Sequence, residues 1–121
     1  MKMTTINIYG MEFYAYHGCF EEEQSIGTRF LVDLSLSYDA EKAVLDDNVE
    51  NAINYQMVYK AIQDVMNKPK HLIETVADGI IKNVKKNFPS ITYIEVIVKK
   101  LNPPLDGKTE FVSVKMAEKC L

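Results

Sequence analysis

The sequence lacks the features that mark metalloproteins and membrane proteins. It has two cysteines and two histidines among 121 residues, and their spacing forms neither a Cys-x-x-Cys pair nor a zinc site. We therefore expect free thiols at Cys19 and Cys120, and no bound metal. No apolar run approaches membrane-spanning length, and no signal-peptide pattern stands at the start. We therefore expect a cytoplasmic protein that does not bind membranes.

A basic block is also missing. The net charge is −3 at pH 7, with acidic and basic residues interspersed, which argues against a nucleic-acid partner. Hydrophobic residues make up 47% and charged residues 26%, as in an ordinary globular protein. There is no linker, low-complexity segment or clear repeat, so we expect a single domain over residues 1–121.

Alternating apolar residues predict strands in both halves of the chain, and helical stripes lie between them. In order, we expect one long strand from Thr5 up to His17-Gly18 with a bulge near Gly10, a loop over Gly18–Gly27, a strand over Phe30–Tyr38 and a short helix over Ala40–Leu45 capped by Asp39. We then expect a helix from the N-cap Asn54 to Met66, a helix over Leu72–Asn87, a strand over Tyr93–Lys100 and a final strand around Val112–Met116. This order predicts an α+β fold, a four-stranded antiparallel sheet with two main helices on one face.

The strand Phe30–Tyr38 also indicates assembly. It is long, no proline guards it, and Leu31 lies off its main apolar face. An unguarded edge strand can pair with another chain. We therefore expect subunits to join edge to edge, in an arrangement that can close into a barrel.

Lys100 is the first candidate for chemistry. In the strand that begins at Tyr93, the side chains of Ile94, Val96 and Val98 share one face, and Lys100 continues their alternation. Loss of solvent on that face disfavours the ammonium form and can produce a working base. On alternation alone, a lysine that extends outward at a strand end is the favoured interpretation.

Other polar residues each admit a structural and a functional interpretation. Glu74 can simply favour a helix N-terminus, or accept two hydrogen bonds from a planar amidine edge. Tyr55 can be a core aromatic residue or a phenol that passes a proton. Glu23 is by default a solvated charge in an acidic loop, His17 is expected to satisfy backbone groups, and His71 is expected in a surface turn.

In this order and spacing the residues resemble the dihydroneopterin aldolase family. The resemblance runs nearly from end to end. The segments that carry it are Gly10–Gly18, Glu23 with Ile26-Gly27, Asp47-Asn48-Val49, Asn54-Tyr55, Leu72-Ile73-Glu74, and Lys100 with Asn102-Pro103-Pro104. It implies the tunnelling fold, with two strands, two helices and two strands. It also implies a homo-oligomer, either a ring tetramer or an octamer of two stacked rings, with active sites between subunits.

The resemblance also implies roles for particular residues. Lys100 would be the general acid and base, acting through an ordered water. Tyr55 of a neighbouring subunit would relay a proton, and Glu23 would hold the substrate side chain and tune Lys100. Glu74 would bind the ring NH and amino group of a pterin. The remaining substrate contacts would come from Leu72, Ile73, Ile53 and Asn54.

The implied reaction is the retro-aldol cleavage of 7,8-dihydroneopterin in folate biosynthesis. Its products are 6-hydroxymethyl-7,8-dihydropterin and glycolaldehyde. The imine of the dihydropterin ring can accept the bond electrons, so neither a lysine Schiff base nor a metal is needed. We therefore expect no cofactor, and an epimerase side activity that forms 7,8-dihydromonapterin.

Two other functions are compatible with parts of the sequence. One is an epimerase acting on dihydroneopterin triphosphate, although the three glutamates next to Gln24 would repel a triphosphate. The other is a ring-forming scaffold or pterin-binding module. A binding module has little use for a proton-transfer pair, so Lys100 and its acidic partners favour the aldolase.

Overall fold

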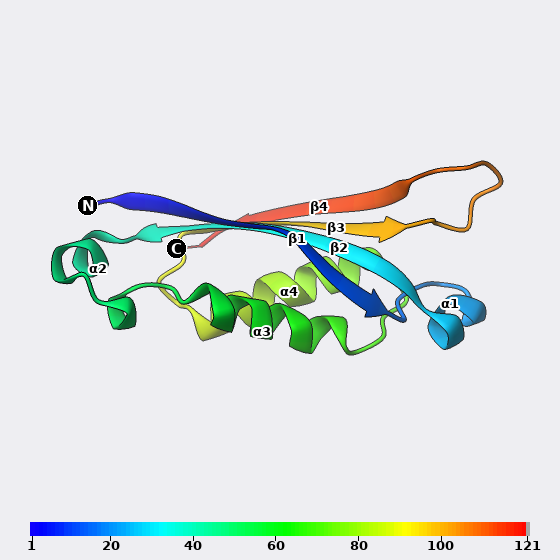
Figure 1. Ribbon diagram of the computed structural model, residues 1–121, viewed down its shortest axis with the longest axis horizontal. Helices are drawn as coiled ribbons and strands as arrows, with labels where there is room; N and C mark the ends of the chain where they lie inside the picture. The colour runs from blue at the N-terminus through cyan, green and yellow to red at the C-terminus, as the bar shows by residue number, and fades with distance from the viewer. Residues whose placement is uncertain (121) are drawn as a thin grey trace.

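The computed structural model describes residues 1–120, in which four strands form one antiparallel sheet (Figure 1). The strands are β1 (Met3–Ala15), β2 (Thr28–Asp39), β3 (Tyr93–Leu101) and β4 (Phe111–Lys119). They lie in the order β1-β2-β3-β4. Because β2 pairs with β1 on one side and with β3 on the other, the prediction that the strand at Phe30–Tyr38 is an edge is wrong. The edges are β1 and β4.

Two long helices, α3 (Tyr55–Met66) and α4 (Ile73–Asn87), cover one face of the sheet (Figure 1). The predicted cap is confirmed, because the side chain of Asn54 accepts a hydrogen bond from the Gln56 N–H at 2.9 Å. Shorter elements flank the sheet: α1 (Glu21–Ile26), α2 (Glu41–Asp46) and the 3-10 turn η1 (Val49–Asn51). The expected α+β fold with helices on one face is confirmed.

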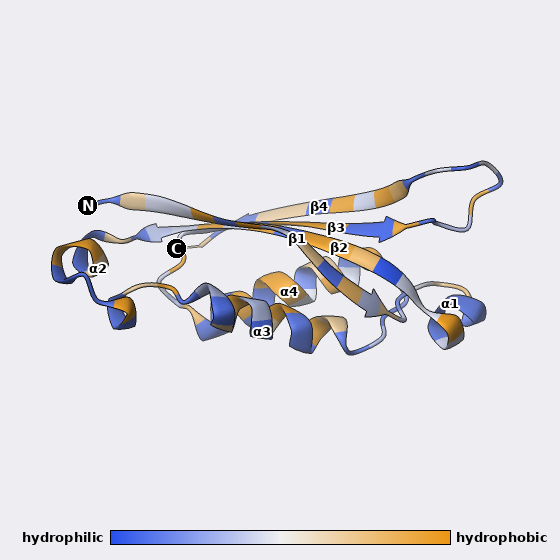
Figure 2. Cartoon of the chain, viewed as in Figure 1, coloured by the Kyte–Doolittle hydropathy of each residue, from blue (hydrophilic) through white to orange (hydrophobic). Residues whose placement is uncertain are grey.

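The core lies between the sheet and the two helices. Every second residue of β2, from Phe30 to Tyr38, is buried, as the alternation predicts. Ile62 of α3 and Ile80 of α4 are both fully buried against this face. Figure 2 shows apolar residues on the facing surfaces of the two layers. No helix of the described residues is both long and apolar enough to cross a bilayer.

Gly10 marks the predicted bulge in β1. The register of the β1–β2 pair shifts between Ile8 and Met11. Gly10 has a φ of 70°, a left-handed conformation that glycine adopts at little cost. Its N–H, which the bulge removes from the regular ladder, donates to Asp33 Oδ1 at 2.7 Å.

The expected loop over Gly18–Gly27 contains the helix α1, which the sequence analysis missed. Three consecutive glutamates fill its first turn, where carboxylates interact favourably with the helix dipole. Gly27, with a φ of 80°, ends the helix. The helix has only six residues and none of them is buried. It therefore carries no apolar stripe from which it could be predicted.

Candidate active site

Lys100 lies near the end of β3, with its side chain directed into the protein. It pairs in register with Phe30 of β2 and Val112 of β4. Only 6% of the residue is exposed, so the interpretation in which the side chain extends into solvent is wrong. Burial lowers the pKa of the Lys100 ammonium group.

Glu23 of α1 forms an ion pair with Lys100. The Glu23 side chain is 13% exposed, so the interpretation as a solvated loop charge is also wrong. The carboxylate favours the ammonium form of Lys100 and so opposes the effect of burial on its pKa. The two groups therefore form an ion pair in a nearly closed space.

Gly18 allows this contact. A Cβ atom at position 18 would lie 2.6 Å from three atoms of the Glu23 side chain. Any larger residue would therefore displace the Glu23 side chain or the start of α1. The Gly18 N–H also donates to the Lys70 carbonyl at 2.9 Å, which ties this loop to the connection between α3 and α4.

His17 is fully buried next to the pair. Its Nδ1 accepts a hydrogen bond from the Lys70 N–H at 3.0 Å, so the neutral ring carries its proton on Nε2. Burial lowers the His17 pKa to about 4; the Met66 carbonyl raises it, and the charge of Lys100 lowers it. The prediction that His17 satisfies a backbone group is confirmed.

Glu74 stands in the first turn of α4 and is exposed, as is the preceding Leu72. The start of α4 is held near α1, because His71 Nδ1 lies 2.8 Å from Gln24 Nε2 and the His71 carbonyl accepts from Cys19 Sγ at 3.3 Å. Among residues 1–120, no hydrogen bond or ion pair joins Glu74 to Lys100. The start of α4, which carries Glu74, and the end of β3, which carries Lys100, lie at the same end of the sheet (Figure 1).

Tyr55 lies at the opposite end. It opens α3, which begins on the α2 side of the molecule, whereas α1 lies on the other side (Figure 1). Tyr55 is 64% exposed, so it is not a core aromatic residue. Asn54 is half-buried and Ile53 is buried beside it. A single chain therefore does not bring Ile53, Asn54 or Tyr55 to Lys100.

The described residues contain no group of three or more histidines, cysteines or acids placed to hold a metal ion. Both Cys19 and Cys120 are free thiols, as predicted. His71 is exposed in the turn before α4, also as predicted.

The fold and the pair define an α+β protein with a buried lysine–glutamate ion pair at one end of its sheet. The sequence matches the family model described as dihydroneopterin aldolase (FolB) over residues 6–117. It is 39% identical over 115 residues to the dihydroneopterin aldolase of Streptococcus pyogenes serotype M18, covering 94% of this chain and 97% of that one. It is 37% identical over 118 residues to the enzyme of the same name from Bacillus subtilis, covering 97% and 98%.

A crystal structure of the E. coli dihydroneopterin aldolase in complex with neopterin has the same fold. Its TM-score is 0.86 at 17% identity, covering 95% of this chain and 98% of that chain. The chain belongs to the dihydroneopterin aldolase family, and its sheet and helices have the tunnelling fold of that family.

Proposed function

We propose that this protein is a dihydroneopterin aldolase of folate biosynthesis. It cleaves 7,8-dihydroneopterin into 6-hydroxymethyl-7,8-dihydropterin and glycolaldehyde, within one domain over residues 1–121 and in the cytoplasm. The observation that carries the proposal is the buried ion pair of Lys100 and Glu23, in a chain that is 39% identical to an enzyme of that name.

The chemistry needs one group that removes a proton and later returns it. Lys100, acting through an ordered water, takes the proton from the hydroxyl on the second carbon of the substrate side chain. That oxygen becomes the carbonyl of glycolaldehyde as the bond between the first and second carbons breaks. The bond electrons move onto the ring imine, and the first carbon then takes a proton, which gives the hydroxymethyl product.

The pair explains how one lysine can serve both steps. Burial favours the neutral amine, whereas Glu23 favours the ammonium ion. With the two effects opposed, a small change at the substrate can move the proton in either direction. If the enamine recombines with the other face of glycolaldehyde, the product is 7,8-dihydromonapterin, so epimerase activity accompanies cleavage.

Glu74 binds the substrate ring. A carboxylate in the first turn of a helix interacts favourably with the helix dipole. Its two oxygens match the ring NH and amino group of a pterin, which form a planar pair of donors. The backbone of Leu72 and Ile73 extends the same surface. The E. coli family member binds neopterin in its crystal structure, which supports a small-molecule pterin substrate.

Tyr55 reaches the site from a second subunit, together with Ile53 and Asn54. Its position at the far end of α3 and its exposed side chain support this arrangement. The strands β1 and β4 each have one unpaired side within the chain, so β1 of one subunit can pair with β4 of the next. Repetition of that contact gives a ring tetramer, and two stacked rings give an octamer.

The role of Lys100 is tested by Lys100→Ala. Loss of the acid–base group should lower turnover of 7,8-dihydroneopterin by about 10²–10⁴-fold, with pterin affinity little changed. Turnover is measured as the release of glycolaldehyde in the presence of a metal chelator. Affinity is measured by equilibrium titration with neopterin. The matched control is Lys99→Ala, because Lys99 points to the other face of β3 and pairs with Asp33 at 3.1 Å. Near-normal cleavage by Lys100→Ala would exclude the assigned base.

The role of Glu74 predicts that its loss mainly weakens pterin affinity, whereas the loss of Lys100 mainly lowers turnover. Glu74→Ala leaves the amidine edge of the bound ring without acceptors, so neopterin binding should weaken by about 10–100-fold. Tight neopterin binding without any release of glycolaldehyde by the unmodified protein would instead favour a pterin-binding module.

A further inference from the structure

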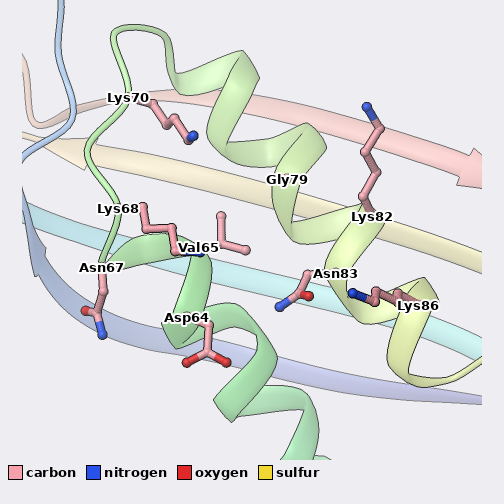
Figure 3. A pocket seen from close by; sticks show the side chains of 9 residues that line it. All are labelled: Asp64, Val65, Asn67, Lys68, Lys70, Gly79, Lys82, Asn83 and Lys86. Carbon is pink, nitrogen blue, oxygen red and sulfur yellow. The ribbon is translucent and has the colours of Figure 1, made fainter.

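A groove that the aldolase reaction does not use lies between α3 and α4. Its volume is about 790 Å³, within the size range of small-molecule sites. Its lining residues are Asp64, Val65, Asn67, Lys68, Lys70, Gly79, Lys82, Asn83 and Lys86 (Figure 3). The groove shares no residue with the Lys100–Glu23 pair.

The groove is strongly basic, although the chain as a whole is acidic. Four lysines and one aspartate line it, whereas the net charge of the chain is −3. Asp64 is already paired with Lys60 at 2.9 Å, and Lys82 with Asp78 at 2.7 Å. The acidic group therefore does not neutralise the groove.

Three ammonium groups are left without an internal counter-charge. Across residues 1–120, no carboxylate forms an ion pair with Lys68, Lys70 or Lys86. Figure 3 shows the side chains of Lys68 and Lys70 extending from the connection between the helices toward the space they share. Lys86 extends back from α4 toward Asn83, and Lys82 points away (Figure 3). Three cations thus surround one space from two sides.

The rest of the lining suits a polar ligand. Asn67 and Asn83 place side-chain amides there, and the Asn83 amide nitrogen donates to the Ala61 carbonyl at 2.8 Å, which holds that side chain in place. Gly79 forms part of the wall without a side chain. A Cβ there would lie 3.2 Å from Val65 Cγ1, so the two helices approach closely beneath the groove.

We propose that this groove binds a compact anion with several charges, of the diphosphate or triphosphate type, through Lys68, Lys70 and Lys86. Several anionic groups are needed to satisfy three cations, two from the connection between the helices and one from α4. Lysine binds phosphate as a point charge and tolerates varied geometry. The groove is short and bounded by two helices, whereas a nucleic acid would need a longer basic surface.

The proposal is tested with inorganic tripolyphosphate, titrated into the intact protein by calorimetry at about 0.1 M salt, where surface charges still interact over about 10 Å. Saturating neopterin is present throughout to occupy the pterin site. We expect saturable binding that weakens at least tenfold in the double variant Lys68→Gln/Lys86→Gln. Lys70 is left unchanged, because its charge also acts on the buried His17.

The matched control is the double variant Lys42→Gln/Lys108→Gln. Both residues are exposed and lie outside the groove, and the change in net charge is the same. We expect its affinity for tripolyphosphate to stay within about twofold of the unmodified protein, and both double variants to keep their thermal stability and aldolase turnover. An equal loss in both double variants would mean attraction by overall charge, and would overturn the proposal. Absence of saturable binding with neopterin present would overturn it as well.

Discussion

At the scale of single residues, the site depends on two polar side chains that the core encloses. Among the described residues, His17 and Lys100 are the two buried side chains of polar or charged type. A buried charge is costly unless it is paired. Lys100 meets this condition through Glu23. His17 avoids the cost of a buried charge by remaining neutral, and its unprotonated nitrogen accepts a hydrogen bond from the Lys70 N–H.

The neutral state of His17 predicts how stability depends on pH. Its pKa is about 4 when folded and 6.5 when unfolded, so below pH 6.5 the unfolded chain binds the additional proton. The free energy of unfolding should therefore fall as the pH drops from 6.5 toward 4, by up to about 3 kcal/mol from this residue. The positive charges of Lys100 and Lys70 near the ring act in the same direction.

Denaturant unfolding of the protein and of His17→Gln at several pH values between 7 and 4.5 measures this contribution. The difference between the two curves should shrink with falling pH, because the glutamine does not titrate. His71→Gln is the control, because it removes the other histidine of the chain, which is exposed. A parallel pair of curves for the protein and His17→Gln would contradict the assignment.

At the scale of elements, the short helix α1 decides where the carboxylate of the pair lies. None of its residues is buried, so packing of apolar side chains does not fix it. The contacts that hold it are polar. Gln24 Nε2 donates to the Gly18 carbonyl at 2.9 Å, and the Glu23 side chain reaches Lys100 over the bare backbone of Gly18.

This arrangement predicts that Gly18→Ala damages catalysis without removing a catalytic group. The added Cβ would need the space of the Glu23 side chain, at 2.6 Å, so that side chain or α1 must shift, and the Glu23–Lys100 contact is disturbed. A displacement of about 1 Å at a reacting group can cost about 10²-fold in rate. We expect turnover to fall by at least tenfold, with a smaller change in neopterin affinity.

Gly107→Ala is the matched control, because a Cβ there meets no atom within 4 Å. Steady-state kinetics and neopterin titration of both variants measure the effect. Unchanged turnover in Gly18→Ala would show that the position of α1 does not limit the reaction.

At the scale of the whole molecule, the two ends of the sheet carry different parts of the proposed site. Lys100, Glu23 and the start of α4 lie at the α1 end, whereas Tyr55 opens α3 at the α2 end (Figure 1). The sheet leaves β1 and β4 open for pairing. The geometry therefore supports a site completed by a second copy of the chain.

Subunit mixing tests this division directly. Lys100→Ala and Tyr55→Phe should each be poorly active alone, whereas a mixture that has been dissociated and reassembled should recover activity. With random assembly at equal amounts, about a quarter of the sites receive both intact residues, because each site draws one from each neighbour. Mixing without dissociation is the control. No recovery after exchange of subunits would mean that one chain supplies both residues.

Local patterns determined most of the fold. The alternation in β2 and β3 and the apolar stripes of α3 and α4 predicted their faces correctly, because burial of one face requires a fixed period along the chain. The bulge at Gly10 and the cap at Asn54 were predicted for the same reason, since each depends on the chemistry of a few neighbouring residues.

Only the tertiary structure decided which groups meet. The order of the strands places β2 inside the sheet rather than at its edge, and pairings between distant segments leave no local periodic signal. The inward turn of Lys100 and its contact with Glu23 depend on α1, which has no apolar stripe. The sequence by itself determined the layers of this protein and its candidate residues. The packing of α1 over Gly18 decided that two of those residues form an ion pair, because a polar contact depends on positions in space rather than on spacing along the chain.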